Sequence, residues 1–142
     1  MTISPKTSGF RALIVGFGSI GKRHAKNLRA LFPGVEICVL RSGSGASASE
    51  NEHTVFDMQS ALAFKPDFAV ICNPASLHLS VAESLAKSGV HLLIEKPLAD
   101  RVPGTDALMA AVSEQSLTAM VAYNLRFSPA LQAMRASVQQ CR

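Results

Sequence analysis

Three glycines are the residues of this sequence whose spacing most clearly predicts chemistry. They stand in the run Gly16-Phe17-Gly18-Ser19-Ile20-Gly21, after an apolar segment and before a segment with helical spacing. In that context the first glycine permits a tight turn, the second lets the backbone approach a pyrophosphate, and the third lets helix and strand pack closely. The pyrophosphate would bind at the N–H groups that begin the helix, where the helix dipole favours an anion. The run therefore predicts a dinucleotide site, with a glycine-rich turn that binds nothing as the alternative.

The residue expected to meet the adenosine ribose is basic rather than acidic. Arg41 lies 20 residues after Gly21, where an NAD-selective site would usually place Asp or Glu. With Ser42 and Ser44, its guanidinium could instead bind a 2′-phosphate through charge-assisted hydrogen bonds. The alternative is a solvated arginine at a strand end. We therefore predict NADP or NAD as the cofactor, with NADP favoured.

A lysine follows a later apolar run and is the candidate catalytic residue. Lys96 stands between Glu95 and Pro97, so it would project from the carboxyl edge of the sheet, where ligands of open α/β sheets bind. There it could hydrogen-bond a substrate hydroxyl, assist its deprotonation and stabilise the alkoxide-like oxygen. Glu95 is interpreted as a partner that orients backbone or cofactor. An isolated lysine at this place could also be an ordinary surface charge.

The remaining titratable residues show no pattern typical of catalysis or metal binding. His24 lies in a predicted helix and His78 at the start of another, where capping or packing is the favoured interpretation, and no metal-ligand spacing joins them. Cys38 and Cys72 lie in apolar runs and are interpreted as reduced core residues. Cys141 lies near the C-terminus, so no disulfide framework is visible.

Composition places the 142-residue chain among ordinary globular domains. Hydrophobic residues make up 48% and charged residues 17%, enough apolar material for one buried core. The net charge of +4 comes from scattered lysines and arginines without interleaved aromatics, which fits an anionic cofactor better than nucleic acid. A polar start and the lack of a long apolar stretch predict a cytoplasmic protein without a membrane span.

Apolar runs and helical segments alternate along the chain, which predicts an α/β fold with a doubly wound parallel sheet, the Rossmann fold. Strands are expected at Ala12–Val15, Glu36–Leu40, Phe68–Cys72, His91–Glu95 and Thr118–Ala122, with a weak one at Thr54–Phe56. Helices are expected at Ile20–Leu31, Met58–Phe64, Leu77–Ser88, Thr105–Gln115 and Pro129–Gln140. The stretch Ser42–Ser49, rich in Ser, Gly and Ala, is expected to form a mobile surface loop beside the ribose.

Five segments together resemble the N-terminal domain of the glucose-fructose oxidoreductase, inositol dehydrogenase and rhizopine-catabolism (Gfo/Idh/MocA) family. They are the glycine run, Cys72–His78, Ala82–Gly89, His91–Leu98 and Tyr123–Pro129. The resemblance implies an NAD(P)-dependent oxidoreductase that acts on a sugar, polyol or related hydroxy or keto compound, with Lys96 at the reacting hydroxyl.

The resemblance also assigns further residues to the site. It implies that Asn73 and Pro74 approach the cofactor, that Asn124 and Arg126 lie near the nicotinamide or substrate, and that the Lys96–Pro97 peptide bond is cis. Motifs and resemblance together predict that the cofactor site comprises Gly16, Phe17, Gly18, Ser19, Ile20, Gly21, Arg41, Ser42, Asn73, Pro74, His78, Glu95, Lys96, Asn124 and Arg126.

By the same resemblance, residues 1–142 form a single NAD(P)-binding domain that lacks the family's C-terminal α+β domain. The last segment, Ser128–Arg142, would lead toward that domain, so the chain is expected to be a fragment or a truncated product. Its apolar stripe of Leu131, Met134, Val138 and Cys141 needs a partner. Packing against the chain's own sheet is favoured, whereas exposure would favour a homo-oligomer.

Two other functions fit parts of the sequence. A nucleotide-binding module without catalysis, such as a redox sensor or a subunit, would keep the glycine loop and would not need Lys96. An S-adenosylmethionine-dependent methyltransferase also begins with a glycine-rich turn, but it would usually carry an acid where Arg41 stands. The Glu95-Lys96-Pro97 element argues further against the methyltransferase.

Overall fold

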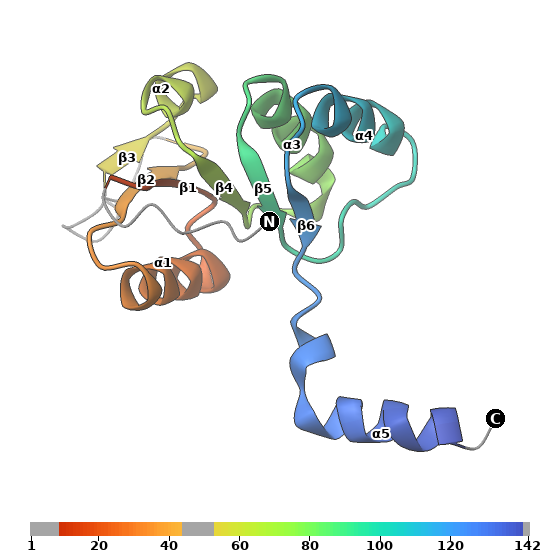
Figure 1. Cartoon of the computed structure of the whole chain (residues 1–142). Coiled ribbons are helices and arrows are strands. Elements are labelled where there is room, and N and C mark those ends of the chain that lie inside the picture. The colour runs from red at the N-terminus through yellow and green to blue at the C-terminus, as the bar shows by residue number, and fades with distance from the viewer. Residues whose placement is uncertain (1–8, 44–52, 141–142) are drawn as a thin grey trace.

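A six-stranded parallel sheet forms the centre of the protein (Figure 1). The computed structural model describes residues 9–43 and 53–140. The strands are β1 (Arg11–Val15), β2 (Glu36–Leu40), β3 (His53–Val55), β4 (Phe68–Ile71), β5 (His91–Ile94) and β6 (Ala119–Val121), in the order β3-β2-β1-β4-β5-β6. The order reverses between β1 and β4, which makes their carboxyl ends the place where a doubly wound sheet binds ligands.

Five α-helices and two short 3₁₀ helices connect and follow the strands. The α-helices are α1 (Ser19–Leu31), α2 (Met58–Ala63), α3 (His78–Lys87), α4 (Thr105–Glu114) and α5 (Pro129–Gln140). The 3₁₀ helices are η1 (Ala75–Leu77) and η2 (Asn124–Phe127), neither of which the sequence pattern predicted. Each predicted strand and helix is present, with its bounds within one residue of the prediction. The predicted α/β class and doubly wound sheet are therefore confirmed.

The core has two layers because alternate side chains of each strand point to opposite faces of the sheet. Helices α2, α3 and α4 cover one face, where Ala61, Leu85 and Leu108 pack on side chains of the strands. Helix α1 covers the other face with Ala25 and Leu28. Strands buried from both sides read as continuous apolar runs, which is why the sequence pattern located them so closely.

Local signals account for several helix ends. Gly89 follows α3 with a φ of +80°, the left-handed conformation that commonly ends a helix. Pro129 is the first residue of α5, where its missing N–H removes no intrahelical bond. The part of the chain that the structure describes has no helix both long and apolar enough to cross a membrane.

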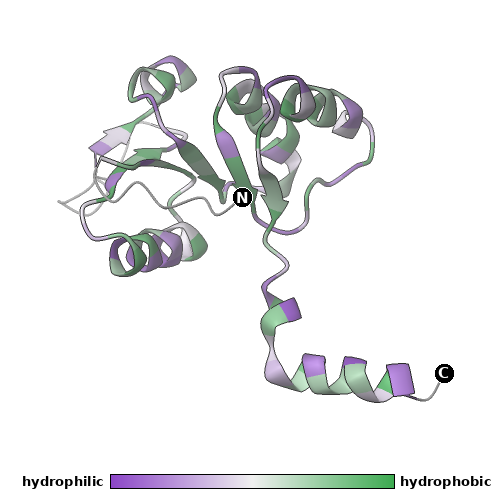
Figure 2. Ribbon diagram, in the orientation of Figure 1, coloured by the Kyte–Doolittle hydropathy of each residue, from purple (hydrophilic) through white to green (hydrophobic). Residues whose placement is uncertain are grey.

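Helix α5 contradicts the prediction that it packs against the chain's own sheet. It projects from the body beyond η2, and none of its described residues is buried (Figures 1 and 2). Leu131, Met134 and Val138 are 43%, 63% and 53% exposed, while Cys141 lies outside the described residues. The amphipathic pattern correctly indicates a helix with an apolar side, but it does not specify which surface covers that side.

Candidate functional site

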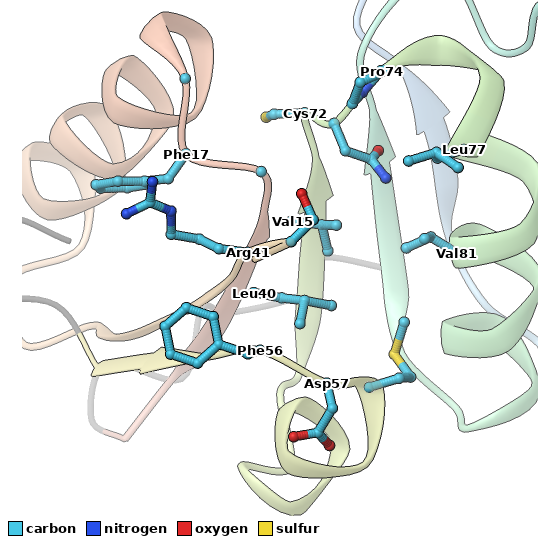
Figure 3. A pocket seen from close by; sticks show the side chains of 15 residues that line it. Val15, Phe17, Leu40, Arg41, Phe56, Asp57, Cys72, Pro74, Leu77 and Val81 are labelled. Atoms are coloured by element: carbon cyan, nitrogen blue, oxygen red, sulfur yellow. The ribbon is translucent and has the colours of Figure 1, made fainter. Parts of the chain in front are cut away.

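A cavity of about 560 Å³ opens at the carboxyl edge of the sheet, beside β1 and β4 (Figure 3). Its volume is within the usual range for small-molecule sites. In Figure 3, side chains from the glycine loop and the end of β2 face those that follow β4 across the opening. The lining residues are Val15, Gly16, Phe17, Gly18, Leu40, Arg41, Ser42, Phe56, Asp57, Met58, Cys72, Asn73, Pro74, Leu77 and Val81.

The glycine loop has the shape that a dinucleotide site requires. Gly16 has a φ of +85°, and a Cβ there would lie 2.8 Å from the backbone nitrogen of Asn73. A Cβ on Gly21 would overlap the carbonyl oxygen of Gly16. Gly18, by contrast, has no atom within 4 Å of the place its Cβ would take, so its outer side is open to a ligand. Two glycines therefore serve close packing, and the one between them leaves room for an incoming group.

The N-terminus of α1 is left without a side-chain cap. Gly18 is the N-cap residue and provides no side-chain acceptor, and the first turn carries no acid. Helix α2 differs, because both carboxylate oxygens of Asp57 accept hydrogen bonds, one from the backbone N–H and the other from the hydroxyl of Ser60, each at 2.7 Å. The opening N–H groups of α1 thus lack the partner that α2 has, and a pyrophosphate could supply it.

Asn73 adds an unpaired acceptor to the same site. Its Oδ1 atom is buried and has no hydrogen-bond partner. A buried amide oxygen is normally paired, so an unpaired one beside a cavity marks a place where a ligand donor could bind. The open side of Gly18, the uncapped helix and the Asn73 oxygen are together compatible with a dinucleotide.

A second cavity, of about 230 Å³, adjoins the first and holds the candidate catalytic lysine. The two cavities share Cys72 and Asn73 in their walls. The smaller one is lined by Ile20, Cys72, Asn73, Ala75, His78, Glu95 and Lys96. Lys96 follows β5 at the carboxyl edge, and its peptide bond to Pro97 is cis, as the resemblance implied. The structure therefore places the lysine next to the cavity formed by the glycine loop.

Glu95 holds this turn through both of its carboxylate oxygens. Oε1 lies 2.8 Å from Nε2 of His24 on α1, and Oε2 accepts a hydrogen bond of 3.2 Å from the backbone N–H of Lys96. The side chains of His24 and Glu95 are only 19% and 15% exposed. Glu95 thus contacts the backbone, as its predicted orienting role requires, and it also pairs with His24, which was not predicted.

His78 is the most deeply buried polar residue of the site. It is 2% exposed, and its ring nitrogens lie 2.9 Å from the carbonyl oxygen of Pro97 and 2.8 Å from that of Asn73. The packing interpretation of this histidine is therefore confirmed. Both of its ring nitrogens are thus engaged by backbone carbonyl groups.

The two described cysteines are free thiols in different surroundings. Burial raises the pKa of Cys38 to about 11, and this residue is fully inside the core. Burial and the nearby charge of Glu95 raise the pKa of Cys72 to about 12, although Cys72 is only partly buried and lines both cavities. Cys72 is thus a wall residue as well as a core residue, and its thiol stays uncharged at neutral pH.

Most of the predicted site residues line these cavities, and four do not. The lining includes residues of the glycine run, the end of β2, the segment after β4 and the turn after β5, but not Ser19 and Gly21, which lie in the first turn of α1. Asn124 and Arg126 lie on η2, and Arg126 lines a separate hollow together with Phe127 and Arg135. Ser44 lies outside the described residues.

The apolar wall of the larger cavity was missed by the sequence analysis. It comprises Leu40, Phe56, Met58, Leu77 and Val81. Leu40 ends β2 and Phe56 directly follows β3, and the carboxyl ends of parallel strands meet at one edge of the sheet. Applying that rule to the short strand at residues 53–55 would have indicated Phe56 and Met58.

Among the described residues, no group of three or more His, Cys, Asp or Glu is arranged to hold a metal ion.

Comparison with known proteins shows to which family the chain belongs. Residues 10–123 match the profile of the Gfo/Idh/MocA oxidoreductase family, described as having an NAD-binding Rossmann fold. The chain belongs to this family. The predicted resemblance to this family is therefore confirmed, over a match that contains four of the five sequence segments and ends at Tyr123, the first residue of the fifth.

Two curated relatives illustrate the range of the family. A 4-carboxy-2-hydroxymuconate-6-semialdehyde dehydrogenase of a Sphingobium species is 31% identical over 86% of this chain and 41% of its own length. The UDP-N-acetylglucosamine 3-dehydrogenase of Acidithiobacillus ferrooxidans is 31% identical over 88% of this chain and 40% of its own length. The chain thus spans about two fifths of the length of these curated relatives.

Solved structures agree with the fold. The Acidithiobacillus UDP-N-acetylglucosamine 3-dehydrogenase GnnA superposes with a TM-score of 0.73 at 28% identity, over 90% of this chain and 43% of the solved one. The WlbA dehydrogenase of Bordetella pertussis, solved with NADH and UDP-GlcNAcA, gives 0.81 at 24% identity, over 94% and 40%. The second likeness supports the fold alone.

Proposed function

We propose that this Gfo/Idh/MocA chain binds NADP or NAD in the larger cavity and provides Lys96 for hydride exchange with a sugar, polyol or related hydroxy or keto compound. The observation that carries the proposal is the pair of adjoining cavities, one formed by the glycine loop and the other holding Lys96, with Asn73 in the wall of both. When bound, the nicotinamide accepts or donates the hydride. The substrate class is supported by the sugar and inositol dehydrogenases among the relatives.

The chain's own residues would hold the cofactor in separate ways. The N–H groups that open α1 would bind the pyrophosphate, and Gly18 leaves the approach free. The buried oxygen of Asn73 would accept a hydrogen bond from the bound dinucleotide. Leu77 and Val81 offer an apolar wall for a base or a ring.

Lys96 would act on the substrate oxygen. In the direction of reduction, an ammonium at the carboxyl edge can hydrogen-bond the carbonyl oxygen of the substrate, stabilise the negative charge that develops there, and donate the proton that completes the hydroxyl; in the direction of oxidation, the neutral amine would take that proton back. The hydrogen bond between Glu95 and the Lys96 backbone would hold the turn in place while the lysine side chain reaches the substrate.

The preference for NADP rests on the charges around the end of β2. Arg41 and Ser42 line the larger cavity, and Asp57 is the acid among its lining residues. Both oxygens of Asp57 accept hydrogen bonds from Ser60, so this carboxylate caps α2. A guanidinium beside the expected ribose position favours a 2′-phosphate, because it can form charge-assisted hydrogen bonds with that group.

Cofactor binding is the decisive experiment. The chain contains no tryptophan, so the fluorescence of NADPH and NADH can be followed directly in parallel titrations. We expect both to bind, with NADPH tighter, and Arg41→Ala to weaken NADPH by about tenfold while NADH changes little. Arg135→Ala, on the projecting helix α5, is the matched control. Binding of neither cofactor at millimolar concentration would overturn the proposal.

The lysine is tested separately. With NADP+ and a panel of sugars and polyols, Lys96→Ala should abolish hydride transfer, and in the binding titration it should leave the dissociation constant of NADPH within about threefold of the parent value. Turnover that survives this substitution would remove Lys96 from the mechanism. A Lys96→Ala variant that binds NADPH and keeps the turnover of the parent protein would favour a site in which the lysine is dispensable.

A further inference from the structure

A buried histidine connects the two cavities of the site. His78 begins α3, and its Nε2 lies 2.8 Å from the carbonyl oxygen of Asn73. Its Nδ1 lies 2.9 Å from the carbonyl oxygen of Pro97. The backbone of Asn73 lies against Gly16 of the glycine loop, and Pro97 directly follows Lys96. One imidazole ring therefore joins the wall of the cofactor cavity to the turn that carries the lysine.

Both of these contacts are made to acceptors. A carbonyl oxygen can only accept a hydrogen bond, and a neutral imidazole has one N–H donor and one bare nitrogen. A neutral ring would satisfy one carbonyl and turn its lone pair toward the other, a contact that burial makes unfavourable. Only the imidazolium donates from both nitrogens. The geometry around His78 thus selects the doubly protonated ring.

The charged groups near the ring permit this state. Glu95 lines the same small cavity as His78 and contributes a carboxylate, which His24 of α1 also contacts. Lys96 contributes a like charge at the same cavity. Cys72, at the end of β4, is an uncharged thiol because its pKa is raised to about 12. Glu95 thus offsets one positive charge in this part of the site, and the two acceptor contacts of the ring favour the second.

We propose that His78 is a positioning residue, held with both ring nitrogens protonated, that sets the separation between Asn73 and Lys96. The inference rests on the proposed function, because it is a bound cofactor and a substrate that give this separation its importance. Each N–H of the ring holds a different backbone segment. Loss of one donor releases one segment and leaves the other in place.

The protonation state can be read from the ring itself. We would label the four histidines of the chain with ¹⁵N and record long-range ¹H–¹⁵N spectra at pH 7, assigning the His78 signals by their loss in His78→Gln. We expect both ring nitrogens of His78 to show the imidazolium shift and both ring protons to exchange slowly with water. A bare-nitrogen signal from His78 would overturn the proposal. This measurement needs no cofactor, so it is decided independently of the proposed function.

The positioning role is tested by substitutions that keep one donor each. The amide nitrogen of Asn lies near the place of Nδ1, and that of Gln near the place of Nε2. His78→Asn should therefore hold Pro97 and release Asn73, weakening NADPH on the order of tenfold while the Lys96 backbone amide shifts little.

His78→Gln should have the opposite pattern. NADPH affinity should stay within about threefold, while the backbone amide signal of Lys96 moves. His53→Gln, at the exposed first residue of β3, is the control and should change neither readout. Parent-like behaviour of both His78 variants would overturn the positioning role. If either variant fails to fold, the ring spectrum of the parent protein still decides the protonation state, and absence of NADPH binding by the parent would count against the proposed function alone.

Discussion

Helices α1 and α5 are alike in sequence pattern and different in their place in the molecule. Both are amphipathic and about three and a half turns long, and each carries a stripe of apolar residues. Helix α1 buries Gly21, Ala25 and Leu28 against the sheet, whereas α5 buries none of its described residues (Figure 2). The difference shows that an amphipathic stripe stabilises a fold only where a complementary face lies within reach of the chain.

The largest contrast should come from a matched pair of leucine substitutions. Leu28→Ala removes a side chain that is 8% exposed and should lower the free energy of unfolding by about 2–3 kcal/mol, because it leaves a cavity between α1 and the sheet. Leu131→Ala, at 43% exposure on α5, should change it by less than about 0.5 kcal/mol. Urea unfolding followed by circular dichroism measures both. Equal losses would mean that α5 is packed in solution.

A second pair of substitutions distinguishes Gly21, which is closely packed, from Gly18, which has open space around it. Gly21→Ala should destabilise the protein by about 1–3 kcal/mol, since the new Cβ meets the backbone of Gly16. Gly18→Ala meets no neighbouring atom, so it should keep the stability and weaken NADPH binding where the pyrophosphate approaches. Thermal unfolding and the fluorescence titration distinguish the two. Unchanged NADPH affinity in Gly18→Ala would contradict the placement of the pyrophosphate.

Removal of α5 tests whether the stability of the sheet and the affinity for NADPH depend on this helix. A chain that ends at Ser128 should melt within about 2 °C of the parent protein, because the deleted helix contributes no buried residue. Its NADPH affinity should also be unchanged, since no α5 residue lines either cavity. A large drop in melting temperature would show that the helix supports the sheet after all.

The smallest effect concerns the start of α2, which has the side-chain cap that α1 lacks. Hydrogen bonds from the backbone N–H and hydroxyl of Ser60 lower the pKa of Asp57 below its ordinary value of 3.8. The folded protein therefore holds the proton less tightly than the unfolded chain, so this stabilisation is present above pH 4 and lost as pH falls through the folded pKa. Asp57→Asn should reduce the fall in stability between pH 7 and pH 3. An unaltered pH dependence would show that the cap carries no charge effect.

Much of the fold and part of the site follow from local sequence signals. The strands are apolar on both faces, and glycine or proline marks the ends of α1, α3 and the start of α5, so their bounds are readable from neighbouring residues. The glycine run is equally local, because its function depends on backbone conformation within one turn. The apolar wall formed by Phe56 and Met58 was harder to predict, since its members come from separate segments and carry no chemical signature.

What the sequence alone determined was the order of elements, the glycine loop and the position of Lys96 at a strand end, because each depends on residues close together along the chain. Only the tertiary structure decided which of these groups meet. His24 reaches Glu95 across 71 residues, and His78 joins the segments after β4 and β5. The sheet order β3-β2-β1-β4-β5-β6 creates those encounters. For α5 too, the sequence pattern specifies a helix, but the surface that this helix contacts depends on where the chain leaves the sheet.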